Sequence, residues 1–252
     1  MSEGKLKHAE DIRTPSGTSS NVIIEIQKLN KHYSVGNNTI NALRDVNLRI
    51  HSTDFVIIFG PSGCGKSTLL NVIAGLDTPS SGSVEVRDTD LFSLEDDKRG
   101  IFRSKKMGII HQMPQWIKSL NVIYNIALPL IIEGVKEKHA ILKAENIMSD
   151  LKITDLALQK PNQLSGGQQQ KASLARALVS NPWIILADEP TGNLDSASSD
   201  EIMGIFDYLN KKYRRTIILV THNQAYWNLG TNRVEMKDGE IIKQSKHINE
   251  HG

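Results

Sequence analysis

The stretch FVIIFGPSGCGKSTLL, residues 55–70, decides the fold of this chain. Its first five residues are apolar and rich in β-branched side chains, which is typical of a buried strand. Residues 60–67 match the pattern G-x-x-x-x-G-K-[ST], and residues 66–74 have a helical pattern. A strand, a glycine-rich loop and a helix in this order predict a phosphate-binding loop in an α/β protein.

The chemistry of this loop follows from its residue types. Glycines let successive backbone N–H groups approach phosphates, and the helix N-terminus adds positive potential. We expect Lys66 to contact the β- and γ-phosphates of a nucleotide and the Ser67 hydroxyl to ligate Mg²⁺. The alternative, a glycine-rich turn that binds nothing, fits the flanking strand and helix less well. The residues expected to bind the nucleotide here are Gly60, Pro61, Ser62, Gly63, Cys64, Gly65, Lys66, Ser67 and Thr68.

Cys64 is the single cysteine of the chain, so no intramolecular disulfide can form. Its presence in the loop permits two interpretations. It is either a small, partly buried filler or a thiol made reactive by the helix N-terminus. We favour the filler. A lone cysteine also suits a reducing cytoplasm.

Further apolar runs predict a doubly wound α/β core outside the loop. Residues 107–110, 184–187 and 216–220 look like buried parallel strands, and residues 199–212 look like a helix. Residues 22–26 and 43–50 predict a small antiparallel β layer whose turn is Gly36-Asn37-Asn38. The mostly helical residues 113–180 predict a lobe inserted between two core strands. We therefore expect one domain over residues 21–245 with a mostly parallel, RecA-like sheet, and tails at 1–20 and 246–252.

Two carboxylates, Asp188 and Glu189, directly follow the apolar run at 184–187. Ligands of open α/β sheets bind at the carboxyl ends of the strands, so these acids are expected near the phosphate loop. Asp188 is predicted to hold Mg²⁺, and Glu189 to orient and activate the water that attacks the γ-phosphate. Alone, such a pair would be interpreted as solvated acids; the phosphate loop upstream favours catalysis.

The sequence LSGGQ at residues 164–168 narrows the range of phosphate-loop proteins to which the chain can be compared. Ser165 can cap a helix, and the two glycines expose N–H donors to an anion. At this point the chain resembles the ABC ATPase family, of which LSGGQ is the signature. The resemblance covers about residues 22–244. It implies that these residues contact the γ-phosphate bound to the opposite subunit of a dimer, through Ser165, Gly166, Gly167 and Gln168.

The same resemblance assigns roles to other positions. Gln112 would reach Mg²⁺ and the attacking water, His222 would sense the γ-phosphate, and Tyr33 would stack on adenine. Residues 193–195 match the loop that crosses the dimer interface. Singly, Tyr33 could be an ordinary loop aromatic and His222 a structural histidine. The chain departs from the family pattern at Lys171, Asn223 and His111, where arginine, aspartate and an apolar or aromatic residue are usual.

The net charge and the hydropathy of the sequence limit which partners the chain is expected to have. Thirty basic and 28 acidic residues give a formal charge of +2, so no global field indicates nucleic acid, and we expect none as a partner. The most apolar run, residues 122–132, contains Asn125 and Pro129 and is too short to span a bilayer. We therefore expect no membrane-spanning helix.

Residues 75–82, 125–134 and 187–196 resemble one branch of the family, the lipoprotein-release and macrolide-efflux (LolD/MacB-type) ATPases. This implies ATP and Mg²⁺ as ligands, ATP-dependent dimerisation with itself, and an integral membrane permease on a separate chain. The subunit would lie at the cytoplasmic face of the inner (cell) membrane and drive export or release of a lipoprotein, peptide or drug. We expect the permease to dock on residues 113–126, whose apolar and aromatic side chains could, each taken singly, instead pack within the helical lobe. Of these side chains, Trp116 is the one that we expect to be the most exposed and to serve as the anchor.

Two other functions remain as alternatives. A soluble ABC ATPase of translation or DNA repair would be expected to carry two cassettes or a long coiled-coil insertion, and the sequence has neither. A small-molecule or nucleotide kinase would share the phosphate loop but would have no reason to carry the signature at residues 164–168.

Overall fold

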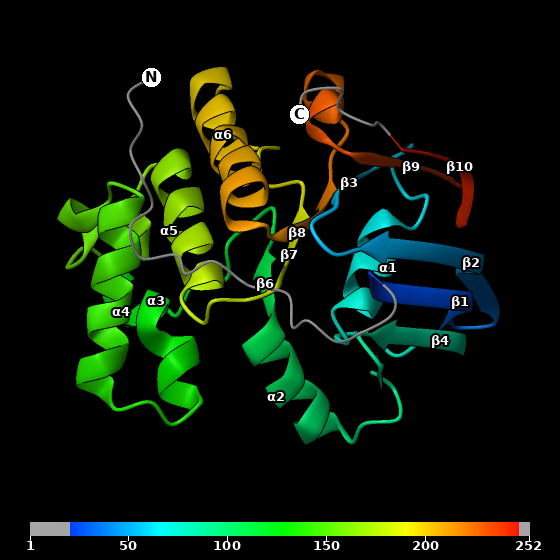
Figure 1. Cartoon of the computed structure of the whole chain (residues 1–252), viewed down its shortest axis with the longest axis horizontal. Helices are drawn as coiled ribbons and strands as arrows, with labels where there is room; N and C mark the ends of the chain where they lie inside the picture. The colour runs from blue at the N-terminus through cyan, green and yellow to red at the C-terminus, as the bar shows by residue number, and fades with distance from the viewer. Residues whose placement is uncertain (1–20, 247–252) are drawn as a thin grey trace.

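The computed structural model describes residues 21–246. The tails expected at 1–20 and 246–252 lie outside these residues, apart from Lys246, which ends a strand. The chain forms two β-sheets and a group of helices that lie beside them (Figure 1). Among the described residues, no helix is both long and apolar enough to cross a membrane.

The larger sheet has six strands in the order β10-β9-β3-β8-β7-β6. The five strands from β9 to β6 in this order are parallel, and β10 pairs with β9 antiparallel. The four apolar runs in the sequence are all strands here, which confirms the mostly parallel core. Their bounds, with those of the two strands that the sequence did not predict, are β3 Phe55–Phe59, β6 Met107–Ile110, β7 Ile184–Asp188, β8 Thr216–Val220, β9 Asn232–Lys237 and β10 Glu240–Lys246.

Both faces of β3, β6, β7 and β8 are largely buried, which explains why these strands are apolar without alternation. In β3, Phe55 and Ile57 belong to one hydrophobic cluster, and Val56 and Ile58 belong to the other. The first cluster lies against the helices α3 to α6, and the second lies against α1 and the antiparallel sheet. The central sheet is therefore held between two apolar layers.

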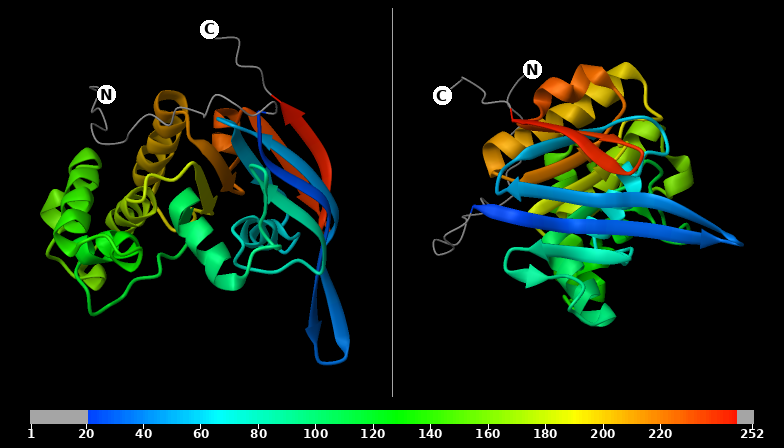
Figure 2. Two further views of the ribbon diagram at one scale, coloured as in Figure 1. Left: turned by 60° about the horizontal axis from the view of Figure 1, so that its bottom comes forward. Right: turned by 90° about the vertical axis from the view of Figure 1, so that its right-hand side faces the viewer.

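The second sheet is antiparallel, with the order β2-β1-β4-β5. It consists of β1 Val22–Val35, β2 Asn38–His51, β4 Ser81–Val86 and β5 Thr89–Asp90. The turn is at Gly36, as expected, with φ of 59°. However, β1 and β2 are much longer than predicted, because their ends form a hairpin that projects beyond the body of the protein (Figure 2). Its polar residues are exposed and give no apolar pattern.

Six α-helices complete the described part of the chain, and three of them, α3 to α5, lie between β6 and β7 in the sequence. These three pack on one another at one side of the molecule (Figure 1). The bounds are α1 Lys66–Ile73, α2 Asp96–Lys106, α3 Val122–Ile132, α4 Glu137–Asp150, α5 Gly166–Leu178 and α6 Ser196–Tyr213. Short 3-10 turns are η1 Thr154–Leu156, η2 Pro161–Gln163 and η3 Gln224–Leu229.

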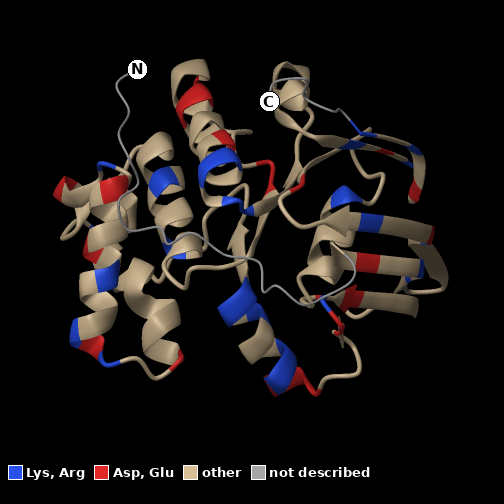
Figure 3. Ribbon diagram, viewed as in Figure 1, with Lys and Arg blue, Asp and Glu red and all other residues tan. Residues whose placement is uncertain are grey.

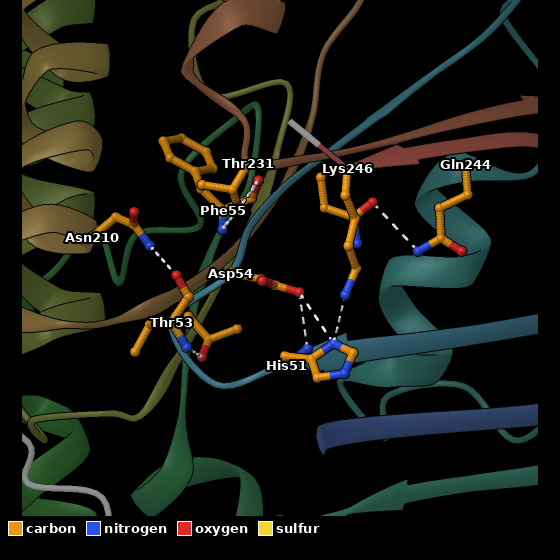
Figure 4. A network of polar contacts seen from close by, with 10 residues as sticks. His51, Thr53, Asp54, Phe55, Asn210, Thr231, Gln244 and Lys246 are labelled. Atoms are coloured by element: carbon orange, nitrogen blue, oxygen red, sulfur yellow. Dashed lines mark hydrogen bonds and ion pairs between the residues drawn. The ribbon is translucent and has the colours of Figure 1, made fainter. Parts of the chain in front are cut away.

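A polar network fixes the chain where it enters β3 (Figure 4). Asn210 of α6 donates to the Thr53 carbonyl at 2.8 Å, and the backbone N–H of Phe55 donates to the Thr231 hydroxyl at 2.9 Å. The backbone N–H of His51 donates to Asp54 at 2.9 Å. Because β3 leads directly into residues 60–67, this network anchors the strand that presents the glycine-rich loop.

Candidate functional site

The glycine-rich loop joins β3 to α1 and has a backbone that only glycine accommodates at two positions. Gly60 and Gly65 have φ of 151° and 100°. A Cβ at Gly60 would lie 2.1 Å from the Met236 carbonyl oxygen, and one at Gly65 would lie 2.4 Å from the Ala42 carbonyl oxygen. The backbone of the loop therefore packs directly against the backbone of β9 and β2, and a side chain at either glycine would prevent this close approach.

Lys66 lies at the start of α1, with its side chain largely buried in this loop. Its ammonium donates to the carbonyl oxygens of Gly60 at 2.9 Å and Pro61 at 2.7 Å. Cys64 is also buried, and its Sγ lies 3.8 Å from the Lys66 Nζ. The cysteine therefore fills space under the loop, which supports the filler interpretation.

A cleft of about 470 Å³ opens above the loop. It is lined on one side by Lys66 and Ser67, and on the other by Gln112, Glu189 and His222. The last three follow β6, β7 and β8, which are neighbours in the sheet. Parallel strands present their carboxyl ends at one edge of the sheet, so residues that lie far apart in the sequence meet in one place. The structure thus brings together nine of the residues predicted from the sequence, the other four being Ser62, Gly63, Gly65 and Thr68.

Gln112 and Glu189 illustrate this convergence, since they are 77 positions apart in the chain (189 minus 112) and line the same cleft. The cleft also has a wall that the sequence analysis missed. Ile40, Asn41 and Ala42 of β2 line it, and the Ile40 side chain is 55% exposed. The only local signal was one apolar residue in a polar stretch, and the predicted strand began after it, at Leu43.

Glu189 has a backbone conformation that is uncommon for a residue with a side chain. Its φ is 45°, and its N–H donates to the Val220 carbonyl of β8 at 3.0 Å. Its Oε2 lies 2.9 Å from Nδ1 of His222 and accepts a hydrogen bond from the His222 backbone N–H at 3.4 Å. Strained backbone of this kind concentrates at functional sites. The acid and the histidine therefore form a coupled pair at the edge of the cleft.

Asp188 ends β7 immediately before this pair. Its Oδ1 is buried and has no hydrogen-bond partner among the described residues. An uncompensated buried carboxylate oxygen is unfavourable unless a cation approaches it. Asp188 is not among the residues that line the cleft, whereas Ser67 and Gln112 are. The Asp188 carboxylate, the Ser67 hydroxyl and the Gln112 amide are all oxygen ligands of the kind that Mg²⁺ prefers. The residues present therefore fit a magnesium ion.

The signature residues form the start of α5, and Ser165 caps this helix as expected. The Gln168 N–H donates to the Ser165 hydroxyl at 3.3 Å, and the Ser165 N–H donates to the Gln168 side chain at 2.9 Å. Neither residue, nor Gly167, lines the phosphate-loop cleft. Gly166 instead lines a smaller pocket of about 170 Å³ with Asn193 and Leu194. Within one chain, the signature and the loop do not form a common site.

Tyr33, the expected adenine contact, is not among the residues that line the cleft. Its hydroxyl donates to Asp77, and the Lys31 ammonium lies 4.7 Å from the centre of its ring. Burial raises the pKa of Tyr33, and the hydrogen bond to the Asp77 carboxylate raises it further. Its stacking on adenine stays a prediction.

The three departures from the family pattern each have a local partner. Lys171 forms an ion pair with Glu201 of α6 at 2.7 Å. The Asn223 side chain caps η3 by accepting from the Ala225 N–H at 3.0 Å. The His111 carbonyl accepts from Gln170 at 3.4 Å, and burial lowers the pKa of its imidazole. These residues therefore have structural contacts that do not involve the cleft.

The expectation that Trp116 is the most exposed anchor of residues 113–126 is wrong. Its indole N–H donates to Gln169 at 3.2 Å, and the Arg176 guanidinium lies 4.6 Å from the centre of its ring, so the side chain is half-buried. The exposed apolar side chains are instead Met113, at 74%, and Ile117, at 44%. Beside them is a groove of about 600 Å³, lined by Pro114, Trp116, Lys118, Ser119, Lys160, Pro161, Asn162 and Gln169.

Comparison with known proteins bears on the class of this site. The family model for ABC transporters matches residues 43–192. The macrolide export ATP-binding/permease protein MacB of Aggregatibacter actinomycetemcomitans is 42% identical over 89% of this chain, which spans only 35% of that protein. The lipoprotein-releasing system ATP-binding protein LolD 1 of Chlorobium chlorochromatii is 36% identical, with 88% of this chain and 91% of that protein covered.

Solved structures give the same result. The dimeric structure of MJ0796, described as a bacterial ABC transporter cassette, matches with a TM-score of 0.84 and 39% identity, covering 88% of this chain and 98% of that one. A dimeric post-hydrolysis state of the same cassette, bound to ADP and Pi, matches with a TM-score of 0.83 and 38% identity over the same shares.

Proposed function

Because the chain belongs to the ABC transporter family, we propose that it is the ATP-hydrolysing subunit of a transporter and that two copies close around two ATP molecules to drive a separate membrane permease. The observation that carries this proposal is the convergence of Lys66, Ser67, Gln112, Glu189 and His222 on one cleft. Phosphoryl transfer needs a phosphate cradle, a metal ligand and a group that positions water, and this cleft offers all three.

In this proposal the side chains have distinct roles. Lys66 and the backbone N–H groups of the loop bind the β- and γ-phosphates. Glu189 orients the attacking water and accepts its proton, while His222, 2.9 Å from Glu189, holds the carboxylate and contacts the γ-phosphate. Ser67, Gln112 and Asp188 would hold Mg²⁺, which neutralises charge on the phosphate oxygens when it is bound.

The need for a second copy is supported by the position of the signature. Ser165 and Gly166 start a helix that can donate N–H groups to an anion, yet they lie away from the cleft of their own chain. A second copy placed with its signature over this cleft would complete the site. The two dimeric structures of the MJ0796 cassette, which has the same fold, are consistent with this arrangement.

The permease is proposed to dock on the surface formed by Met113, Ile117 and the groove beside Trp116. Asn125, which is fully buried, fixes this surface from inside. Its side chain accepts from the Ile117 N–H at 2.9 Å and donates to the carbonyl oxygens of Ile117, Leu120 and Asn121 at 3.0 to 3.2 Å. The loop therefore presents its apolar residues in a defined conformation, as an anchor surface requires.

By analogy with the relatives named for macrolide export and lipoprotein release, we propose that the cargo is a lipoprotein, a peptide or a drug. The subunit would lie at the cytoplasmic face of the cell membrane, attached through its permease. Its chemistry is confined to ATP, and recognition of the cargo belongs to the partner chain.

ATP turnover of the purified chain tests this function. Lys66→Ala is expected to reduce turnover by at least about a hundredfold, because it removes a cation from a site that works by electrostatic stabilisation. Lys138→Ala, which removes an exposed cation from α4, is the control and is expected to keep wild-type turnover. Equal rates for Lys66→Ala and the wild-type protein would refute the proposed function.

A further inference from the structure

Helix α2 presents a concentration of positive charge that the proposed ATPase does not use. Five of its eleven residues are basic, and none of its residues is buried. Figure 3 shows basic residues along much of this helix, which stands out at the lower side of the molecule, and Figure 2 shows the same helix turned toward the viewer. The sequence did not predict this helix, because it has no apolar periodicity.

The acidic residues near α2 are at its N-terminal end. Lys98 pairs with Glu95 at 3.1 Å, and Arg99 pairs with Asp96. Toward the C-terminal end the cations have no such partners. We define the α2 cationic cluster as Arg87, Arg103, Lys105 and Lys106; no ion pair joins any of these four to an acid among residues 21–246.

Trp183 holds two members of the cluster close together. The Lys106 ammonium lies 3.7 Å from the centre of the indole ring, and the Arg87 guanidinium lies 4.1 Å from it. Burial lowers the pKa of Lys106, and the neighbouring charges of Arg87 and Lys105 lower it further. Asp88 interacts with Arg87 electrostatically but does not pair with it. The fold therefore keeps like charges together, and a bound anion would relieve their repulsion.

Exposed aliphatic side chains lie beside these charges. Ile101 of α2 is 56% exposed, and Leu76 is 47% exposed. Leu76 is next to Gly75, whose carbonyl accepts from the Arg103 guanidinium at 3.1 Å, so it lies at the same surface. Basic side chains interspersed with exposed aliphatic ones are suited to the interface of an anionic bilayer, where the charges meet headgroups and the aliphatic groups enter the acyl boundary.

We propose that the α2 cationic cluster, with Ile101 and Leu76, binds the phosphate-bearing headgroups of anionic phospholipids. The proposal rests on the proposed function in one respect, since the permease would keep this surface within reach of a bilayer. An acidic protein partner could bind through the cations alone and would not need the adjacent aliphatic side chains. A lipid bilayer would contact both, so these side chains favour lipid as the partner. Contact with the membrane would then be made by this chain directly as well as through its permease.

The test measures binding of the purified chain, without permease, to phosphatidylcholine vesicles with and without phosphatidylglycerol. The double variant Ile101→Ser/Lys105→Gln changes exposed positions of α2, and Lys106→Gln is added to it in a triple variant. The matched control is Leu142→Ser/Lys143→Gln, which removes one exposed aliphatic residue and one exposed cation from α4. ATP turnover of every variant, measured in parallel, shows that the protein is folded.

The wild-type chain is expected to bind the vesicles that contain phosphatidylglycerol and to release them as salt is raised. Affinity should fall by about fivefold for each cation removed from the cluster, and the control should keep wild-type affinity. Equal binding to both kinds of vesicle, absence of binding, or equal losses in the α2 and α4 variants would overturn the proposal. The proposal would also be overturned if the α2 variants lost copurification with the permease while their vesicle binding stayed unchanged. Absence of ATP turnover in the wild-type chain would instead refute the proposed function.

Discussion

Single residues set the shape of the nucleotide cleft, and Gly65 gives the sharpest example. Gly65→Ala is expected to lower the free energy of unfolding by about 1 to 3 kcal/mol and to weaken ATP binding, because the residue has φ of 100° and the new Cβ would lie 2.4 Å from the Ala42 carbonyl oxygen. Denaturant unfolding and nucleotide titration measure the two effects. Gly204→Ala, in α6 with open space at the Cβ position, is the control. A fully stable Gly65→Ala protein that binds ATP normally would contradict this account of the loop.

Local motifs predicted most residues of the cleft, since those residues follow strands whose patterns are visible in the sequence. Exposure was harder to predict. Trp116 is half-buried because Gln169 and Arg176, more than 50 positions away in the chain, contact its ring. Ile40 lines the cleft because a hairpin carries it there, and neither fact has a signal in the neighbouring residues.

At the scale of elements, the start of α5 depends on its cap. Ser165→Ala is expected to lower the free energy of unfolding by about 1 kcal/mol, because it removes the hydroxyl that accepts from the Gln168 N–H. Urea unfolding measures this loss. Ser149→Ala in α4, where only the backbone carbonyl and not the side chain takes part in the cap, should leave the stability nearly unchanged. If both variants unfold at the same urea concentration, the cap contributes nothing to the stability.

The loop before α3 is expected to carry the contact with the permease. Ile117→Ser should reduce copurification with the permease by about tenfold or more, which corresponds to a loss of about 1.4 kcal/mol of binding free energy. ATP turnover of the isolated subunit should stay at the wild-type level. Ile242→Ser, which changes a similarly exposed isoleucine on β10, is the control. Normal copurification of Ile117→Ser would place the docking surface elsewhere.

Elements with two buried faces were predictable, and elements with polar exposed faces were not. Strands β3, β6, β7 and β8 are nearly continuous apolar runs because both of their faces are covered. The ends of β1 and β2 are polar because they form the projecting hairpin, and the polar helix α2 has no buried residue. Hydrophobic periodicity in the sequence reflects which residues are buried, so it gives no signal for an element that has no buried face.

At the scale of the whole molecule, the central claim is that one chain holds an incomplete site and that a second copy completes it. The cleft contains Lys66, Glu189 and His222, whereas Ser165 lies outside it. Closure of two copies should therefore depend on the γ-phosphate, to which the signature of the opposite copy would donate N–H groups. Slowing hydrolysis should allow the closed pair to accumulate.

Size-exclusion chromatography of the Glu189→Gln protein tests this claim most directly. The amide keeps the size of the side chain but cannot accept a proton from water, so ATP should bind and persist. We predict a dimer with ATP and Mg²⁺, a monomer with ADP and Mg²⁺ or without nucleotide, and a monomer in all conditions when Ser165→Arg is added. A Glu189→Gln protein that stays monomeric with ATP, or that hydrolyses ATP at the wild-type rate, would contradict the account.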